Sequence, residues 1–267
     1  MGIINWLLNK IIPYSKNRAD THEFKANLRV QKHDPRDFLL TTQPYQYPIK
    51  SSISKLPPIR NQQNIGSCAS HAVIGLYETL LLNFKPNQFI EGSELYHYYN
   101  ARKYVAKTFP NDSGMTLRDA CKTLDKYHMA LEYACPYNTT KFNTRPSNSS
   151  YLTSRLHKIK SYESIGSLNE IKGTIAEGIP VMCGIDVYDS FMSMQEGQFY
   201  VPSGRFIGGH AQEIVAYDDE DATFTIRNSW GNWGSRFGDL NEKGYYKIKQ
   251  DVFMKISLKY GYWIISI

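Results

Sequence analysis

The hydrophobic pattern of this chain changes its period near Pro180, and this change limits the folds that are open to it. Before Pro180, apolar residues recur at steps of three and four, which is typical of amphipathic helices. After Pro180, apolar and polar residues alternate as they do in strands. Helices followed by strands, rather than interleaved with them, indicate an α+β chain. We therefore expect a helical lobe over residues 68–175 and a β lobe over residues 176–267 that includes part of the N-terminal segment, with a cleft between the lobes.

Four helices are predicted in the first part of the chain. One begins at Cys68 and ends before Pro86, which cannot continue a helix, and another covers residues 93–103. The other two begin at Thr116 and Ser167, each followed three positions later by an acidic residue, as in a capping box. Residues 137–150 predict a surface loop. Strands are expected at 181–187, 213–217, 223–228, 244–249 and 262–267.

Composition excludes some classes of function. The chain has 267 residues, of which 42% are hydrophobic, so it can bury a full core. Its net charge of +6 arises from 31 basic and 25 acidic residues spread along the sequence. A nucleic-acid-binding domain usually concentrates its basic residues in a patch, so we expect no nucleic-acid partner. The sequence gives no indication of the oligomeric state.

The four cysteines stand at positions 68, 121, 135 and 183 and include no Cys-x-x-Cys pair. A structural zinc site is therefore not expected, and we predict neither a metal nor a cofactor. If Cys68 stays free, at most one disulfide can form within the chain. That pattern favours a reducing intracellular compartment over a secreted scaffold.

Residues 1–13 are apolar but are interrupted by Asn5, Asn9 and Lys10. The stretch is too short to span a membrane and lacks the basic start and cleavage site of a signal peptide. We expect a short amphipathic helix that packs on the protein itself. The alternative is contact with a membrane surface through these residues.

Three separated segments carry the residue types that a cysteine nucleophile requires. Cys68 follows Gly66-Ser67 at the start of a predicted helix, where backbone N–H groups favour a thiolate. His210 follows Gly208-Gly209 and supplies an imidazole, and Asn228 supplies an amide that can orient the ring. The set predicts a nucleophile, a base and an orienting group.

A hairpin explains how two of these residues meet. The acidic run at 218–221 lies between two strand-like segments and predicts a turn. Centring the turn on Asp219 places His210 opposite Asn228 on one face of the hairpin. The same register places Glu213 diagonal to Arg227 on the other face, which we expect to be exposed to solvent. A slip of one residue would separate His210 from Asn228.

These residues, with Asn61-Gln62 and the run Asn228-Ser229-Trp230-Gly231, resemble the papain-like cysteine peptidases, most of all the short microbial and viral members. His210 lies within that family's spacing of about 130–150 residues after the cysteine, and Asn228 lies slightly beyond it. The resemblance covers about residues 34–267. It implies a papain-like fold with a helical lobe, an antiparallel β-barrel-like lobe and the active site between them. It also implies that residues 45–267 form a cysteine endopeptidase domain acting on peptide or protein substrates.

The resemblance implies a role for each site residue. Cys68 attacks the peptide carbonyl as a thiolate and forms a thioester, His210 pairs with it and protonates the leaving amine, and Asn228 holds the imidazole. The side chain of Gln62 and the backbone N–H of Cys68 form the oxyanion hole. Gly184 borders the pocket for the second residue upstream of the cut, and its missing side chain suits a bulky apolar residue. The full set of expected substrate-binding residues is Gly114, Gly184, Gly209 and Trp230.

Three positions depart from the family pattern. Ile65 stands where a disulfide cysteine is usual, and Ala69 replaces the aromatic residue after the nucleophile. The second change alters the wall on the leaving-group side of the cleft. His71, one helical turn from Cys68, is expected to be a hydrogen-bonded packing residue rather than a second base.

Two other functions stay open. A protein that keeps the fold but only binds its partner would lack an activated thiolate, whereas a peptide ligase or an isopeptide hydrolase would use the same residues to form different products. Residues 1–44 are expected to be an N-terminal extension or a short inhibitory prosegment, although the family's long helical prosegment signature is absent. Residues 34–38 alternatively strap the two lobes together.

Overall fold

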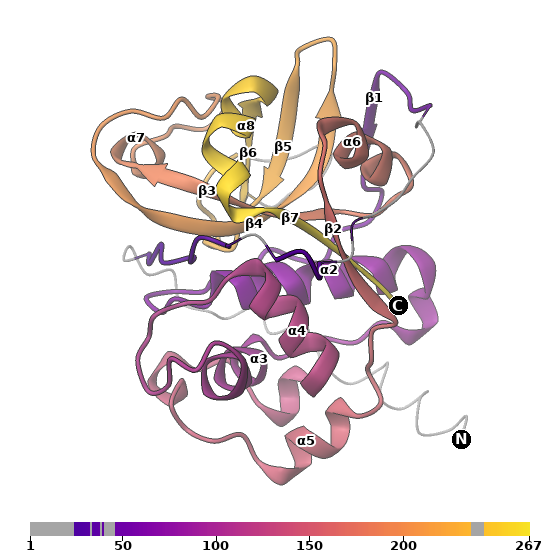
Figure 1. Cartoon of the computed structure of the whole chain (residues 1–267), viewed down its shortest axis with the longest axis vertical. Coiled ribbons are helices and arrows are strands. Elements are labelled where there is room, and N and C mark those ends of the chain that lie inside the picture. The colour runs from indigo at the N-terminus through magenta and orange to yellow at the C-terminus, as the bar shows by residue number, and fades with distance from the viewer. Residues whose placement is uncertain (1–23, 33, 38, 40–45, 236–242) are drawn as a thin grey trace.

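The computed structural model describes residues 24–32, 34–37, 39, 46–235 and 243–267 (Figure 1). Its helices are α2 (Cys68–Phe84), α3 (Glu94–Asn100), α4 (Leu117–Tyr127), α5 (Asn148–Ser154), α6 (Leu168–Ala176), α7 (Asp189–Met192) and α8 (Gln250–Ser257). Its strands are β1 (Lys50–Ser52), β2 (Ser161–Ile165), β3 (Val181–Tyr188), β4 (Phe206–Asp218), β5 (Thr223–Arg227), β6 (Tyr245–Lys249) and β7 (Tyr262–Ser266).

The helices and the sheet occupy two halves of the molecule, which confirms the predicted α+β class. Helices α3, α4 and α5 lie in one half, the sheet with α6, α7 and α8 lies in the other, and α2 runs between them (Figure 1). The strand order is β2-β7-β3-β4-β5-β6, with β1 also paired to β4 and every pair antiparallel. Because β2 and β6 end this order, the sheet is open in the part of the chain that the structure describes.

The local sequence explains where the helices begin and end. Thr116 and Ser167 form capping boxes, because each accepts a hydrogen bond from the backbone of the third helical residue, whose carboxylate bonds back. The predicted start of α2 at Cys68 and its end ahead of Pro86 are confirmed. The helix predicted at 93–103 is shorter than expected, since α3 ends at Asn100 and a π-helical turn, Ala101–Val105, follows it.

The hairpin of β4 and β5 forms, but its predicted register is wrong. Ile214 pairs with Ile226, and Glu213 lies directly opposite Arg227 instead of diagonal to it. The register then shifts between Ile214 and Ala216, where an irregularity interrupts the pairing. The face that carries Glu213 and Arg227 packs against α2 rather than facing solvent, and the two residues are only 2% and 5% exposed. At Glu213 and Ile214 the observed pairing differs from the predicted one by two residues. An even displacement leaves each side chain on the predicted face of the hairpin.

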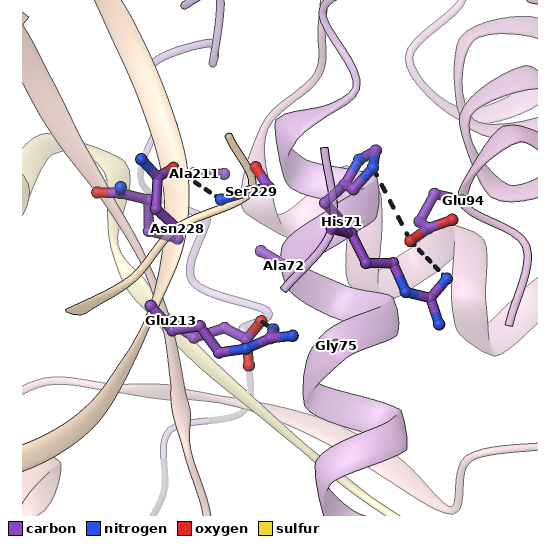
Figure 2. A pocket seen from close by; sticks show the side chains of 11 residues that line it. His71, Ala72, Gly75, Glu94, Ala211, Glu213, Asn228 and Ser229 are labelled. Atoms are coloured by element: carbon purple, nitrogen blue, oxygen red, sulfur yellow. Dashed lines mark hydrogen bonds and ion pairs between the residues drawn. The ribbon is translucent and has the colours of Figure 1, made fainter. Parts of the chain in front are cut away.

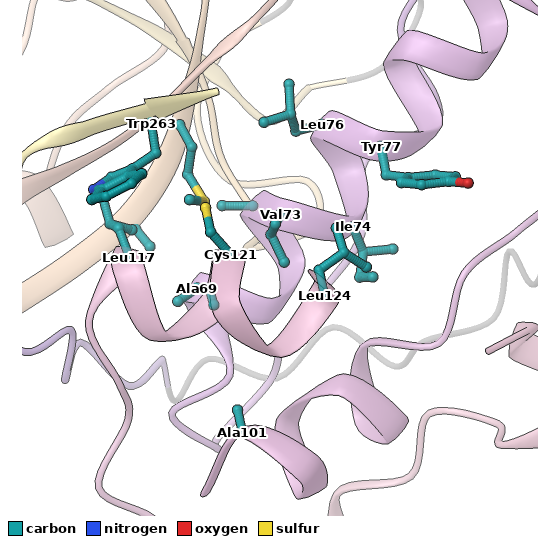
Figure 3. Packing of buried hydrophobic residues seen from close by; sticks show 14 of the residues in the cluster. Ala69, Val73, Ile74, Leu76, Tyr77, Ala101, Leu117, Cys121, Leu124 and Trp263 are labelled. Atoms are coloured by element: carbon teal, nitrogen blue, oxygen red, sulfur yellow. The ribbon is translucent and has the colours of Figure 1, made fainter. Parts of the chain in front are cut away.

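Helix α2 supplies much of the core between the two halves. Figure 3 shows Ala69, Val73 and Ile74 of this helix near Leu117 and Leu124 of α4. All of these residues are 1% exposed or less. The same cluster extends to Trp263 on β7, so the central helix contacts both the helical half and the sheet. This packing fixes the position of the first residue of α2, Cys68.

A buried ion pair lies where α2 meets the sheet. Arg227 Nη1 donates to Glu213 Oε1 at 2.7 Å, and Arg227 Nη2 donates to the carbonyl oxygens of Pro57 and Pro58. Gly75 of α2 permits the approach, because a Cβ at that position would lie 2.4 Å from Glu213 Oε1 (Figure 2). Burial raises the pKa of Glu213 to about 7, against the opposing effect of Arg227.

We expect Arg227→Met to lower the free energy of unfolding by about 3–5 kcal/mol at pH 7.5, because it leaves the Glu213 carboxylate buried and unpaired. Burial raises the pKa of Glu213 in the folded protein, so the folded state favours the protonated carboxyl group. This contribution to the free energy of unfolding is present at low pH and is lost as pH rises through about 7. The cost of the variant should therefore shrink at about pH 5. Urea denaturation at both pH values measures this.

The matched control is Lys255→Met, which removes an exposed ion pair with Asp251. Its effect should stay below about 1 kcal/mol. Equal losses of stability in the two variants would contradict a structural role for the buried pair.

Candidate active site

Cys68 is the first residue of α2 and is fully buried. The preceding residue, Ser67, makes no side-chain cap, so the first backbone N–H groups of the helix are left to the sulfur. The backbone groups of Cys68, Ala69 and Ala211 near the sulfur favour its ionised form and lower the pKa of the thiol. The contact with Ala211 places the sulfur beside β4, at the residue that follows His210.

His210 and Asn228 are joined by a hydrogen bond. His210 Nε2 donates to Asn228 Oδ1 at 2.7 Å, and the same oxygen accepts the backbone N–H of Ser229. This bond selects the neutral tautomer with its proton on Nε2, so that Nδ1 is left as an acceptor. Within the described residues Nδ1 has no hydrogen-bond partner. Trp230 stacks on the imidazole, with 4.6 Å between ring centroids and 29° between planes.

Gln62 is held against the Asn228 segment. Its backbone N–H donates to the carbonyl oxygen of Ser229 at 2.8 Å, and Ser229 Oγ donates to Gln62 Oε1 at 2.9 Å. These bonds orient the amide so that Nε2 donates to two carbonyl oxygens, those of Ile65 and Lys25, each at 3.0 Å. The donor that the sequence assigned to an oxyanion hole therefore already binds a backbone carbonyl from the N-terminal region.

The residues 24–31, here called the covering segment, lie across this site. Phe24 stacks on Trp230, with 4.6 Å between centroids and 6° between planes. The backbone of Asn27 lies near enough to the Cys68 sulfur to oppose the rise in the pKa of the thiol. The backbone N–H of Leu28 donates to the carbonyl oxygen of Gly209 at 2.7 Å. In Figure 1 this indigo part of the chain passes between the two halves of the molecule.

The three glycines predicted to bind substrate all lie against the covering segment. A Cβ at Gly184 would come within 2.3 Å of Leu28 Cδ2, and one at Gly114 would come within 2.2 Å of the carbonyl oxygen of Asn27. At Gly209 it would come within 2.6 Å of the carbonyl oxygen of Leu28. The covering segment therefore occupies space next to these three positions that is free only because they are glycines.

Burial under the segment keeps the nucleophile and the base uncharged. Burial raises the pKa of the Cys68 thiol to about 11, although backbone hydrogen bonds oppose the shift. It lowers the pKa of His210 to about 4, although the hydrogen bond that His210 donates to Asn228 opposes this. We expected an ionised sulfur beside an imidazolium. In the covered site the loss of water outweighs the backbone groups near the sulfur and the hydrogen bond to Asn228, and both groups are neutral near pH 7.

A small cavity of about 10 Å³ lies behind Asn228 and Ser229, between α2 and β4. Figure 2 shows His71 and Glu94 on one side of it and Glu213 on the other. It holds no more than about one water molecule, so it is not a substrate pocket.

His71 is a packing residue, as the sequence predicted. Its Nδ1 lies 3.1 Å from the carbonyl oxygen of Ser67, and its ring contacts Tyr137 edge to face. Its Nε2 lies 3.8 Å from a carboxylate oxygen of Glu94, on the side of the helix that faces α3. These contacts hold the ring in the helical half.

All four cysteines are free. Cys121 and Cys183 are fully buried, and burial raises the pKa of both thiols, whereas Cys135 is partly exposed. The predicted amphipathic helix or membrane contact at residues 1–13 lies outside the described residues. Within the described residues, no helix is long and apolar enough to cross a bilayer.

Sequence reasoning missed the residues that fill the site. Lys25, Asn27 and Leu28 lie in a stretch with no clear hydrophobic period, so nothing in the pattern assigned them to the cleft. Ser229 was noted only as part of a motif, yet its hydroxyl orients Gln62. A small polar residue directly after the predicted orienting amide was the one signal that could have indicated this role.

Comparison with known proteins identifies similar chains. A family model described as "Papain family cysteine protease" matches residues 44–261. An uncharacterized peptidase C1-like protein of Acanthamoeba polyphaga mimivirus is 29% identical over 77% of this chain and 68% of its own length. Cathepsin B-like cysteine proteinase 3 of Caenorhabditis elegans is 33% identical over 43% of this chain, and the match spans only 32% of that protein. Among solved structures, xylellain, a cysteine protease from Xylella fastidiosa, has a TM-score of 0.80 at 26% identity, covering 95% of this chain and 99% of its own.

We expect Cys68 in the full-length chain to react with iodoacetamide at pH 7 more slowly than free cysteine does, because burial raises the pKa of its thiol to about 11. Mass spectrometry of the alkylated protein gives the rate at each cysteine. Cys135, the partly exposed thiol, serves as the internal control and should react sooner. Preferential labelling of Cys68 in the native chain would show that the covering segment does not shield it.

Proposed function

Because the chain belongs to the papain family of cysteine proteases, we propose that Cys68, His210 and Asn228 cleave internal peptide bonds of polypeptide substrates. The observation that carries this assignment is the 2.7 Å bond between His210 Nε2 and Asn228 Oδ1. It leaves Nδ1 as the acceptor, while the Cys68 sulfur contacts the next residue of the same strand, Ala211. These contacts support the assignment of Cys68 as the nucleophile, His210 as the base and Asn228 as the orienting amide of acyl transfer.

Acylation begins with the proton of the Cys68 thiol passing to His210 Nδ1. The thiolate attacks the carbonyl carbon, and the carbonyl π electrons move onto oxygen. Gln62 Nε2 and the backbone N–H of Cys68 stabilise this oxyanion. As the oxyanion collapses, the C–N bond breaks, the leaving nitrogen takes the proton from Nδ1, and a thioester remains on Cys68.

Deacylation repeats these steps with water. His210 Nδ1 takes a proton from the water as its oxygen attacks the thioester carbon. The C–S bond then breaks, the carboxylic product leaves, and the proton returns to the sulfur. Asn228 holds the imidazole plane through both stages, and Trp230 covers the face of the ring against water.

We assign residues 1–44 as an inhibitory prosegment and residues 45–267 as the peptidase domain. The support is the position of the described part of the prosegment, in which the carbonyl oxygen of Lys25 takes the Gln62 donor and Leu28 takes the Gly184 pocket. Further along, Asp37 accepts two hydrogen bonds from Arg118 of α4, and Leu39 forms a bridge with Ser164 of β2. The strap alternative is compatible with this, because the same stretch contacts elements of both halves.

The chain direction of the covering segment explains why Cys68 does not cleave it. The family resemblance assigns the Gly184 pocket to a residue upstream of the cut. Leu28 occupies that pocket, whereas Lys25, which comes earlier in the chain, lies at the oxyanion donor. The segment therefore runs opposite to a substrate, and its peptide bonds are presented to the sulfur with the wrong polarity for acyl transfer.

The expected test of latency is Leu28→Asp in the full-length chain. Leu28 is 5% exposed and packs on Gly184 and Tyr260, so a carboxylate there should expel the segment from the cleft. We expect hydrolysis of a fluorogenic peptide with leucine second before the cut to rise about tenfold or more, together with alkylation of Cys68 at pH 6. Cys68→Ala in the same chain should return hydrolysis to background.

The matched control is Leu39→Asp, because Leu39 lies on the same stretch but is 65% exposed. It should leave turnover close to that of the parent chain. If Leu28→Asp exposes a Cys68 that alkylates no faster than free cysteine, the protein is a silent binding module of the same fold. If joined or branched products dominate on defined peptides, the chain is a ligase or an isopeptide hydrolase.

Gln62→Ala in the Leu28→Asp chain should lower kcat by about 10²–10³, the usual effect of losing one oxyanion donor. The rate of Cys68 alkylation should change little, since that reaction forms no oxyanion. Steady-state kinetics and the alkylation rate, measured on one preparation, separate these effects. A parallel loss of both rates would indicate a disturbed fold instead of a missing donor.

A further inference from the structure

Asp112 is the residue of the cleft that the catalytic chemistry leaves unexplained. Its Oδ1 accepts the backbone N–H of Gly66 at 2.9 Å and the hydroxyl of Tyr98. Its Oδ2 accepts Lys25 Nζ of the covering segment at 2.5 Å. The carboxylate is thus oriented by two fixed donors on one oxygen, and its other oxygen is directed at the occupant of the cleft. With the segment in place its side chain is 14% exposed.

The place of Asp112 along the cleft follows from the neighbouring residues of the covering segment. Leu28 fills the pocket at Gly184, which the resemblance assigns to the second residue upstream of the cut. Asn27 is the next residue toward Cys68, and its side chain lies against Gly66, where a Cβ would meet Asn27 Nδ2 at 2.1 Å. Asn27 Nδ2 also donates to the backbone oxygen of Asp112 at 3.1 Å. The space between the Gly184 pocket and the sulfur is therefore bordered by Asp112.

Asp112 brings a negative charge to this space, where Lys25 pairs with it. The Arg102 guanidinium lies 4.3 Å from the ring centroid of Tyr98, the residue whose hydroxyl bonds Asp112. The Arg102 guanidinium donates to the carbonyl oxygens of Pro110 and Asn111 and to Asn143 Oδ1, so its donors are directed at the loop. The Asp112 carboxylate consequently keeps one oxygen for a ligand cation, which in the covered chain is the ammonium of Lys25.

We propose that Asp112 selects substrates with a lysine or arginine immediately upstream of the cleaved bond, and that Lys25 occupies this specificity site in the latent chain. The proposal rests on the proposed proteolytic function and adds the substrate class. A basic side chain from that position extends toward Gly66 and reaches Asp112 Oδ2. Its cationic group takes the place of the Lys25 ammonium, so that opening the site does not leave the carboxylate unpaired.

The test uses the full-length Leu28→Asp chain and two fluorogenic peptides that differ only in having lysine or glutamine before the cut. We expect kcat/KM for the lysine peptide to exceed that for the glutamine peptide about tenfold or more, the usual effect of one charged hydrogen bond. Asp112→Asn should remove most of this preference, because the variant keeps Oδ1 for Gly66 and Tyr98 and replaces only the oxygen that faces Lys25. Asp251→Asn, at an exposed carboxylate on α8, controls for the change in net charge.

Two further measurements keep the proposal falsifiable. Raising the salt concentration from about 0.05 to 0.5 M should narrow the lysine preference of the unchanged Leu28→Asp chain, which requires no substitution at Asp112. Fluorescence anisotropy measures how tightly the same peptides bind to the chain carrying both Cys68→Ala and Leu28→Asp, which cannot cleave them. A lysine-to-glutamine ratio that neither Asp112→Asn nor salt changes overturns the proposal. If neither peptide is cleaved, the proteolytic assignment fails, and the anisotropy ratio still decides whether Asp112 recognises a cation.

Discussion

The burial of helix α2 on both of its sides is the constraint on which the site depends. Every residue from Cys68 to Leu81 is buried, with α4 against one side of the helix and β4 against the other. Gly75 lets the Glu213–Arg227 pair approach the helix closely. Because a close-packed interior allows little displacement, the first residue of the helix stays in a fixed position relative to the strand that carries the imidazole. The reacting groups are therefore aligned by packing between two rigid elements.

The covering segment affects this site by excluding water from it as well as by contacting its residues. A thiolate and an imidazolium are stable only when they are solvated or paired, and a site sealed by Phe24, Asn27 and Leu28 offers little solvation. Burial accordingly shifts the pKa of Cys68 up and that of His210 down, each toward the neutral form. The covering segment thus both blocks the substrate and keeps Cys68 and His210 in their neutral, unreactive forms. Access for a substrate and activation of the sulfur are expected to appear together.

The sequence was informative where structure is local and much less so where it depends on distant contacts. Thr116 and Ser167 start helices through side chains three residues apart, so their capping boxes were predictable. The turn before β5 was predictable for the same reason, but its register was not, because an irregularity in β4 shifts the pairing. His210 and Asn228 still meet, since the preserved alternation keeps their side chains on one face. Residues 24–31 carry no periodic signal, and their conformation comes from the cleft that they occupy.

The segment that seals the site belongs to the same polypeptide, and this connectivity has a thermodynamic consequence. A tethered ligand has an effective concentration that is commonly millimolar, whatever the concentration of the protein. Dilution therefore cannot free the cleft of the intact chain. One break in the backbone after residue 39 would turn closure into a bimolecular equilibrium, which dilution does weaken. The same contacts that hold an unbroken chain shut would then release it at low concentration.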